Sequence, residues 1–334
     1  MKKDINIQEF PRVSIIILNY NGKRFLHRCL SSLLKSDYPD YEVIFVDNNS
    51  TDGSVKFVLQ HFKNMKNLKI IKLSKNYGFS IGNNIGAKHA EGNYLAFLNP
   101  DTEANPNWLK KLVEVMNSDS SIGVAQPKLL LIDSKRFDTA GCFLNPYGLT
   151  WSRGSEEEDK GQYDKIKEIF YAKGAALIIR RDLWSKLGGF DPIFFIYYEE
   201  TDLCWRAWNH GYKVVYVPEA KVFHFGGAVL KNIPYHVKYH EARGRPILLI
   251  KNYSPKNVFR YVPLTIILQL LNAIRQLLKG SLSSALAVVK GTVWCIIHFG
   301  KTWRARKVAE RSIKNQDRRR VFRLMKKNVG FTLG

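Results

Sequence analysis

From residue 13 to residue 127, short apolar runs alternate with segments of helical periodicity. The apolar runs cover residues 13–18, 42–46, 68–73, 94–98 and 122–126. Between them, apolar residues recur at helical spacing in 23–34, 54–62, 80–90 and 107–116. Uninterrupted apolar runs are typical of strands buried on both faces, and intervening helices are typical of parallel βαβ units. The pattern predicts an α/β fold with a Rossmann-like, mostly parallel sheet flanked by helices.

Polar residues follow four of these predicted strands directly. The segments are NYNG at 19–22, DNNSTDG at 47–53, SKNYGF at 74–79 and NPDT at 99–102. Parallel sheets bind ligands at the carboxyl ends of their strands. Asn, Asp and Gly also form turns and cap helices, so each loop alone has a structural explanation. Four such loops in succession indicate a binding site.

Acidic residues and one histidine are candidates for chemistry at this site. Asn99 and Asp101 could present two oxygens to a hard divalent cation, which would bridge the phosphates of a nucleotide. Glu199, Glu200 and Asp202 begin a predicted helix, and one of these carboxylates could accept a proton from an attacking hydroxyl. The helix dipole alone also explains acids at that position. His224 follows a predicted strand and is close to glycines that allow a ligand to approach.

The chain changes character after about residue 246. Residues 261–278 and 281–299 are largely apolar, and residues 301–327 are densely basic. This order predicts amphipathic helices that lie in a membrane interface, with Lys and Arg against anionic headgroups. Two other interpretations stay open, a helical subdomain packed on the core and one tilted spanning helix at 261–278. Each uncharged run is shorter than the roughly 20 residues that usually span a bilayer.

Charge is distributed unevenly along the 334 residues. The net charge is +23, and residues 203–334 contain 25 lysines and arginines against 4 acidic residues. Such a region could bind anionic lipid, acidic substrate or nucleic acid. No nucleic-acid recognition motif appears, so we expect no nucleic acid as partner, although a basic nucleic-acid-binding protein is the alternative of a different class.

Composition narrows the class of protein further. Hydrophobic residues make up 45% of the chain, as in ordinary globular proteins. The four cysteines are far apart and form no CxxC pair, which is typical of reduced thiols in the cytosol. The first residues, MKKDINIQEFPR, contain no apolar signal-peptide segment, so we expect a cytoplasmic location.

Several motifs together resemble family 2 glycosyltransferases of the GT-A fold, especially the rhamnosyltransferase-like subgroup. They are VSIIILNYNG, VDNNSTDGS, NYGFSIGNNIG, FLNPDT, GAALIIRRDLWSKLGGFDP, EETDLCWRAWNHGY and VFHFGG. The resemblance covers residues 12–255 and implies a GT-A domain there. Residues 1–11 are then an N-terminal extension, and residues 256–334 are the basic amphipathic, membrane-associating helical region.

The resemblance also implies roles for single residues. Nucleotide-binding positions are Asn19, Tyr20 and Asp47 at the base and ribose, with Asn76, Gly78 and Asn99 nearer the diphosphate. Asp101 matches the retained acid of an Asp-x-Asp site for Mg²⁺ or Mn²⁺, and His224 completes that site. Glu200 matches the catalytic base. Because the family has Asp at this position, Glu199 and Asp202 remain rival bases.

The implied activity is inverting, metal-dependent transfer of a sugar from a nucleotide-sugar donor. The expected donor is dTDP-rhamnose, and the expected acceptor is a cell-surface polysaccharide or a lipid-linked glycan. The enzyme would bind peripherally at the anionic cytoplasmic face of the membrane. The alternatives are a UDP-sugar-dependent galactofuranosyl or hexosyl transferase and a catalytically inactive sugar-nucleotide-binding subunit.

Overall fold

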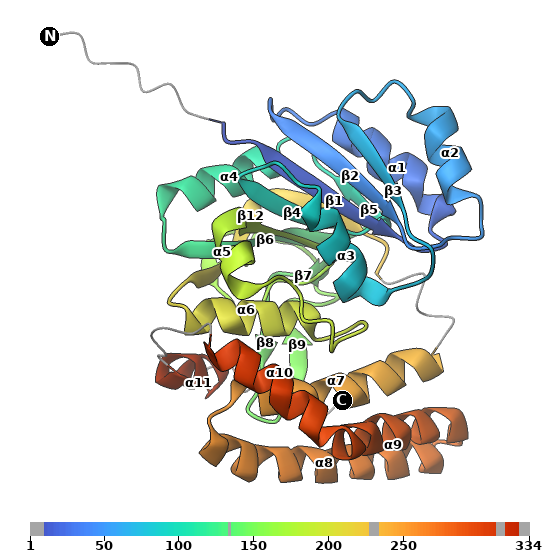
Figure 1. The fold of residues 1–334 in the computed structure, drawn as a ribbon. Coiled ribbons are helices and arrows are strands. Elements are labelled where there is room, and N and C mark those ends of the chain that lie inside the picture. Colours follow the sequence, from blue (N-terminus) through green and yellow to red (C-terminus); the bar gives the residue numbers. More distant parts are fainter. Residues whose placement is uncertain (1–9, 133–134, 227–233, 312–317, 327–334) are drawn as a thin grey trace, which may run out of the picture.

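A mixed sheet forms the centre of the molecule, with helices against both faces (Figure 1). The computed structural model describes residues 10–132, 135–226, 234–311 and 318–326. The strand order is β10-β12-β6-β11-β4-β1-β2-β3. Its members are β1 (Val13–Asn19), β2 (Tyr41–Asp47), β3 (Leu68–Lys72), β4 (Tyr94–Leu98), β6 (Ile122–Leu131), β10 (Lys167–Glu168), β11 (Ala176–Arg180) and β12 (Lys213–His224). The predicted α/β class is confirmed.

The two faces of the sheet bury two separate apolar cores. Side chains from α1 (Lys23–Leu34), α2 (Ser54–His61) and α4 (Trp108–Ser118) contribute to one core. The other core takes side chains from α3 (Gly78–Lys88), α5 (Arg181–Leu187) and α6 (Glu199–Asn209). Because both faces are covered, the central strands can be apolar without alternation, as the sequence pattern predicted.

Several strands depart from the parallel arrangement, and β11 is the one that lies between parallel strands inside the sheet. β1 pairs in parallel with β2 and β4, and β2 with β3, but β11 is antiparallel to both β4 and β6. β12 is 12 residues long, from Lys213 to His224. Its carboxyl half pairs with β6 and with the short β5 (Thr102–Ala104), and His224 lies opposite Thr102. This pairing brings residue 224 beside the NPDT loop.

Short strands extend the sheet near this edge. β7 (Phe137–Thr139) pairs with the carboxyl half of β6. β8 (Cys142–Leu144) and β9 (Thr150–Ser152) form a separate two-stranded sheet. All three strands come after residue 127, where the alternating pattern of the sequence ends.

Five helices form a layer below the sheet (Figure 1). They are α7 (Pro234–Asn252), α8 (Pro255–Leu278), α9 (Leu282–Ile297), α10 (Phe299–Arg311) and α11 (Arg318–Lys326). α7 packs on α9 and α10, and α8 packs on α9. Gly291 permits the close α7–α9 crossing, since a Cβ there would lie 2.5 Å from the Tyr239 carbonyl oxygen. Three helices after the predicted boundary at residue 255, α8, α9 and α10, thus pack on α7, which precedes it.

Some of the predicted basic and N-terminal segments fall outside the described residues. These are residues 1–9 of the extension and residues 312–317 and 327–334 of the basic region. Among the described residues, α8 has the length and apolar character needed to cross a membrane. α9 and residues 299–307 meet this criterion together, but they are bent by 63°.

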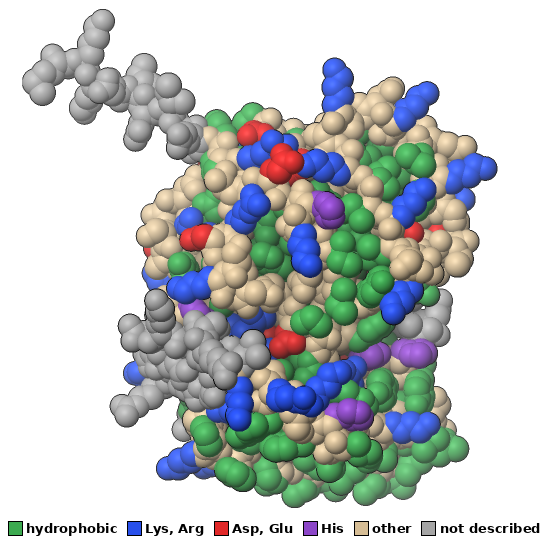
Figure 2. All heavy atoms as spheres, in the orientation of Figure 1, with side chains coloured by type: hydrophobic (Ala, Val, Ile, Leu, Met, Phe, Trp, Pro, Cys, Tyr) green, Lys and Arg blue, Asp and Glu red, His purple; other side chains and the backbone are tan. Residues whose placement is uncertain are grey.

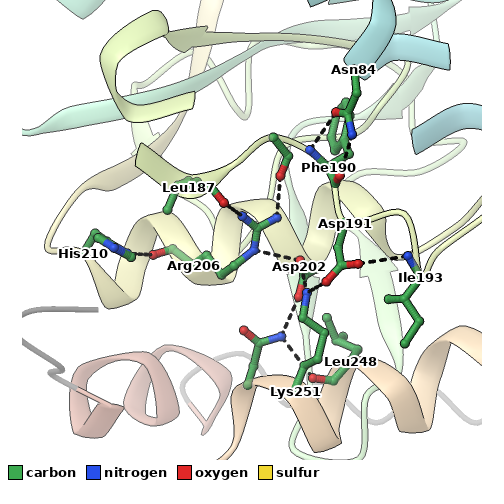
Figure 3. Close-up of polar contacts among 12 residues, drawn as sticks. Asn84, Leu187, Phe190, Asp191, Ile193, Asp202, Arg206, His210, Leu248 and Lys251 are labelled. Atoms are coloured by element: carbon green, nitrogen blue, oxygen red, sulfur yellow. Dashed lines mark hydrogen bonds and ion pairs between the residues drawn. The ribbon is translucent and has the colours of Figure 1, made fainter. Parts of the chain in front are cut away.

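A buried ion cluster joins α6, α7 and the loop before α6 (Figure 3). The fully buried Asp202 accepts hydrogen bonds from Arg206 Nε at 2.8 Å, Lys251 Nζ at 2.9 Å and Asn252 Nδ2 at 2.8 Å. Arg206 also donates to the carbonyl oxygens of residues 187 and 189. Two cations of the basic region, Arg206 and Lys251, therefore lie inside the protein. Removing one partner of a buried ion pair typically lowers the free energy of unfolding by about 3–5 kcal/mol.

Candidate active site

Two adjoining cavities lie at the carboxyl ends of the central strands. The larger has a volume of about 790 Å³ and the smaller about 380 Å³, and Phe79, Asn99 and Tyr197 are among the residues that line both. The larger is lined by Tyr20, Asn48, Asn76, Gly78 and Asp101 from the sheet side and by His236, His240 and Arg243 from α7. The smaller is lined by Asp138, Lys173, Glu199, Glu200 and His224.

The loops after β1, β2 and β3 are joined by side-chain amides. Asn48 Nδ2 donates to Asn76 Oδ1 at 2.9 Å, and Asn48 Oδ1 accepts from the backbone N–H of Tyr77 at 2.9 Å. These loops form one wall of the larger cavity. Behind this wall, Asn19 Nδ2 donates to Asp47 Oδ1 at 3.2 Å. Asn19 and Asp47 are both buried and are not among the cavity-lining residues. Their observed contacts order the loops that form the wall.

Position 78 accepts only glycine. Its φ is +78°, and a Cβ there would lie 2.5 Å from the Phe195 ring and from the Phe195 carbonyl oxygen. The next residue, Phe79, donates its backbone N–H to that same oxygen at 2.7 Å. The loop after β3 is therefore fastened to the loop before α6, so both sides of the larger cavity are fixed together.

Asp101 and His224 lie side by side because β5 pairs with β12. Both are buried, and Asp101 Oδ1 lies 3.4 Å from His224 Nε2. Among the described residues, Nε2 has no hydrogen-bond partner, whereas Nδ1 is bonded to Asp138 Oδ2 at 2.9 Å. Burial lowers the pKa of His224, but the carboxylates of Asp101 and Asp138 raise it above its ordinary value.

The two side chains fit a divalent cation. A buried, unsatisfied imidazole nitrogen next to a carboxylate oxygen is a suitable pair of ligands for such an ion. Within the described part of the chain, no group of three or more His, Cys, Asp or Glu side chains could hold a metal ion. Asp101 and His224 would thus supply two ligands, and the remaining positions would be open to oxygens of a bound phosphate.

Glu199 is buried and Glu200 is half-buried at the smaller cavity, and neither carboxylate is in an ion pair among the described residues. One oxygen of each carboxylate has no hydrogen-bond partner among the residues described. Burial raises the pKa of Glu199 well above its ordinary value, and the neighbouring Glu200 carboxylate raises it further. Burial also raises the pKa of Glu200, although the Lys173 charge opposes this. A raised pKa is typical of carboxylates that take part in proton transfer.

Asp202 differs from both glutamates. Burial raises the pKa of its carboxyl, but the charges of Arg206 and Lys251 lower it below its ordinary value. Asp202 lines neither of these two cavities. The three acids of EETD therefore have two different surroundings, although they begin the same helix.

The model of the family described as "Glycosyl transferase family 2" matches residues 14–187. This chain belongs to glycosyl transferase family 2. The GT-A fold is confirmed by likeness to the mannosyltransferase PcManGT from Pyrobaculum calidifontis, solved in complex with GDP-Man and Mn²⁺. That likeness has a TM-score of 0.55 at 18% identity, over 91% of this chain and 86% of the other.

Curated relatives match this chain over part of its length. The O-antigen biosynthesis protein RfbC of Myxococcus xanthus is 29% identical over 65% of this chain, which spans 18% of that protein. The N-acetylglucosaminyl-diphospho-decaprenol L-rhamnosyltransferase of Mycobacterium tuberculosis is 23% identical over 63% of this chain and 75% of that protein. The chain spans less than half the length of the first two curated relatives it matches.

In this family 2 chain, most of the predicted site residues come together. Tyr20, Asn76, Gly78, Asn99 and Asp101 line the larger cavity, and Asn99, Glu199, Glu200 and His224 line the smaller one. Asn19 and Asp47 lie behind the wall, and Asp202 lies in the ion cluster. The roles that the resemblance implies for these residues remain predictions.

Sequence reasoning missed several residues of the site. His236, His240 and Arg243 are spaced by four and three residues, so one face of a helix carries all three, and this spacing was visible in the segment HVKYHEAR. Burial lowers the pKa of His240 to about 4, which leaves the ring neutral at pH 7. Asn48 was visible as part of the second polar loop. Asp138 and Lys173 had no such signal, because strand pairing alone brings them to the cavity.

Proposed function

We propose that this chain is an inverting, metal-dependent glycosyltransferase that moves a sugar from a nucleotide-sugar donor to a cell-surface polysaccharide or a lipid-linked acceptor. The observation that carries the proposal is the smaller cavity. Two carboxylates with raised pKa and His224 line it, and Asp101, 3.4 Å from His224, lines the larger cavity beside it. The larger cavity can then hold the donor, and the smaller cavity can admit the acceptor hydroxyl.

The larger cavity suits the donor. Its volume of about 790 Å³ is within the usual range for small-molecule sites, about 300–1,000 Å³. Tyr20 offers a half-exposed ring for a base, and the Asn76–Gly78 loop and Arg243 offer hydrogen-bond donors for the ribose and phosphates. The rhamnosyltransferase relative supports dTDP-rhamnose as the donor. A UDP-linked galactofuranose or hexose is the alternative.

Glu200 is the base in this proposal. Its carboxylate takes the proton of the acceptor hydroxyl while that oxygen attacks C1 of the sugar from the face opposite the nucleoside diphosphate. The C1–O bond to the diphosphate breaks in the same step, so the anomeric configuration inverts. Asp101 and His224 would hold the divalent cation, whose charge stabilises the leaving diphosphate when it is bound. Glu199, next to Glu200, raises the basicity of the pair by like-charge repulsion.

A donor screen tests the proposed function. Hydrolysis of dTDP-rhamnose, UDP-galactofuranose, UDP-hexoses and GDP-mannose, with water as the acceptor of the sugar, would be measured as nucleoside diphosphate release, with Mg²⁺ or Mn²⁺ and again with excess EDTA. We expect release from dTDP-rhamnose, and we expect EDTA and Asp101→Ala to abolish it, because Asp101 is one of only two protein oxygen or nitrogen ligands proposed here. Release that is unchanged in EDTA and in Asp101→Ala would contradict the metal role, and release from none of these donors would contradict the proposed activity.

Replacing Glu200 by Gln tests the base. The amide keeps the shape of the side chain but cannot accept the proton, so we expect turnover to fall about 10²–10⁴-fold with donor affinity unchanged. The base works only above its pKa, and that pKa is raised, so the wild-type rate should fall with acid at a higher pH than an ordinary Glu, about 4.3. Initial rates across pH and calorimetric donor binding measure both effects. Glu199→Gln is the matched comparison. An active Glu200→Gln beside an inactive Glu199→Gln would reassign the base.

We also propose that the helical layer binds the membrane surface. Figure 2 shows apolar side chains gathered on the lower face of the molecule, over α8 and α9. Exposed apolar residues there include Phe259, Ile267, Leu271, Ile274, Leu278, Leu282, Ile296 and Ile297, and Leu278 is 85% exposed. An apolar face of this extent is typical of a protein or membrane interaction site. Lysines and arginines on the same helices provide attraction to anionic headgroups.

The burial pattern of α8 favours attachment parallel to the surface. Its buried residues Val258, Tyr261, Val262, Thr265, Gln269 and Ala273 form one stripe that faces the protein. Thr265 donates to the Tyr147 carbonyl oxygen at 3.1 Å, and Gln269 donates to Thr292 of α9 at 2.8 Å. With α8 packed on the protein along this stripe, its opposite face is free to contact lipid while the helix stays in place. The packed-subdomain and membrane interpretations are then compatible.

Vesicle binding of surface variants tests this attachment. We expect the triple change Leu271→Glu, Ile274→Glu, Leu278→Glu to abolish sedimentation with anionic vesicles, because it places charge on the apolar face. The matched control changes Leu34, Leu59 and Ile166 to Glu, three exposed apolar residues of the GT-A domain. High salt should release wild type only partly, since it screens the basic residues and not the apolar contact. Equal binding of wild type and the α8 variant would remove the membrane proposal.

A further inference from the structure

Asp138 is placed by an irregularity in β7. Leu129 of β6 pairs with Thr139, but the next residue, Leu130, pairs with Phe137. Asp138 is therefore the additional residue between two paired positions, as in a β-bulge. Bulges redirect a side chain and are frequent next to active sites. Here, the carboxylate of Asp138 reaches His224, which stands on β12 at the other edge of β6.

The contacts of Asp138 link two sides of the smaller cavity. Its carboxylate accepts from Lys173 Nζ through both oxygens, at 2.6 and 2.7 Å, and Oδ2 lies 2.9 Å from His224 Nδ1. Lys173 is itself held by its backbone N–H, which donates to Gln126 Oε1 at 2.9 Å. Asp138 is 8% exposed and His224 3%, so solvent does not replace these bonds easily.

We propose that Asp138, held by Lys173, is a positioning residue that orients His224 for metal binding. Its carboxylate accepts the proton of Nδ1, and the lone pair of the neutral ring is then on Nε2, which faces Asp101 Oδ1 at 3.4 Å. A second carboxylate behind a metal-binding histidine fixes both its tautomer and its ring orientation. This inference rests on the proposed metal role of Asp101 and His224. Asp138 itself would not contact the ion.

A purely structural role for Asp138 makes a different prediction. In that case the Asp138–Lys173 pair would join β7 to the segment before β11, and its loss would lower the melting temperature without a specific effect on metal affinity. In our proposal, Asp138 acts through His224. The effect of removing Asp138 must then disappear when His224 is already absent.

The test measures Mn²⁺ binding to the full chain by electron paramagnetic resonance, with dTDP or UDP present as the nucleotide probe. The set is wild type, Asp138→Ala, His224→Ala, the double variant and the control Glu219→Ala, which removes an exposed carboxylate from the same strand as His224. We expect Asp138→Ala to weaken Mn²⁺ binding about 10–100-fold, as is typical of such partners. The double variant should bind Mn²⁺ no more weakly than His224→Ala. Asp138→Asn, which keeps an acceptor oxygen, should lose less, and it is the variant to use if Asp138→Ala does not melt cooperatively.

The outcomes separate this inference from the metal role on which it rests. Weaker binding in His224→Ala together with unchanged binding in Asp138→Ala and Asp138→Asn would overturn the positioning role alone. Losses that add in the double variant would also overturn it, because independent effects add and effects through one residue do not. Unchanged Mn²⁺ binding in both Asp101→Ala and His224→Ala would overturn the metal role and this inference with it.

Discussion

The arrangement of the site depends on where the positive charge near the start of α6 is placed. Three carboxylates occur within four residues there, of which Glu199 and Asp202 are buried and Glu200 is half-buried. Arg206 and Lys251 both pair with Asp202. Glu199 and Glu200 therefore keep unsatisfied oxygens at the cavity, and burial raises their pKa values. If Lys251 faced a glutamate instead, that carboxylate would be a stable anion and a weak base.

The same ion cluster positions α7, which lines one side of the larger cavity. Lys251 and Asn252 are at the carboxyl end of α7, and His236, His240 and Arg243 near its other end line the cavity. α9 packs on α7 at Gly291, and the Arg243 guanidinium lies 3.9 Å from the centroid of the Trp294 ring. One helix thus connects the buried anion at α6, the wall of the larger cavity and the apolar face of α8 and α9. The proposed donor site and the proposed membrane-binding face are held in a fixed relation as a result.

The sequence was sufficient for the local features of this architecture. Apolar runs located the parallel strands, and the polar loops after them located Tyr20, Asn76 and Asp101 on one cavity, because parallel strands end at a common edge. It was insufficient where partners come from distant strands or helices. The bulge that turns Asp138 toward His224 is a matter of register with β6, and the charge that distinguishes Asp202 from Glu200 is Lys251, 49 residues further along the chain. The antiparallel β11 was likewise hidden, since its apolar run resembles that of a parallel strand.

The most direct test of this account is the titration of the three carboxyl groups themselves. NMR of the full chain labelled with ¹³C at the Glu and Asp carboxyl carbons would follow them, with Glu199→Gln, Glu200→Gln and Asp202→Asn used for assignment. We expect both glutamates to titrate above the ordinary value of about 4.3, and Asp202 to stay ionised below its ordinary value of about 3.9. Two glutamates that titrate at ordinary values, or an Asp202 that takes up its proton before them as the pH falls, would contradict it.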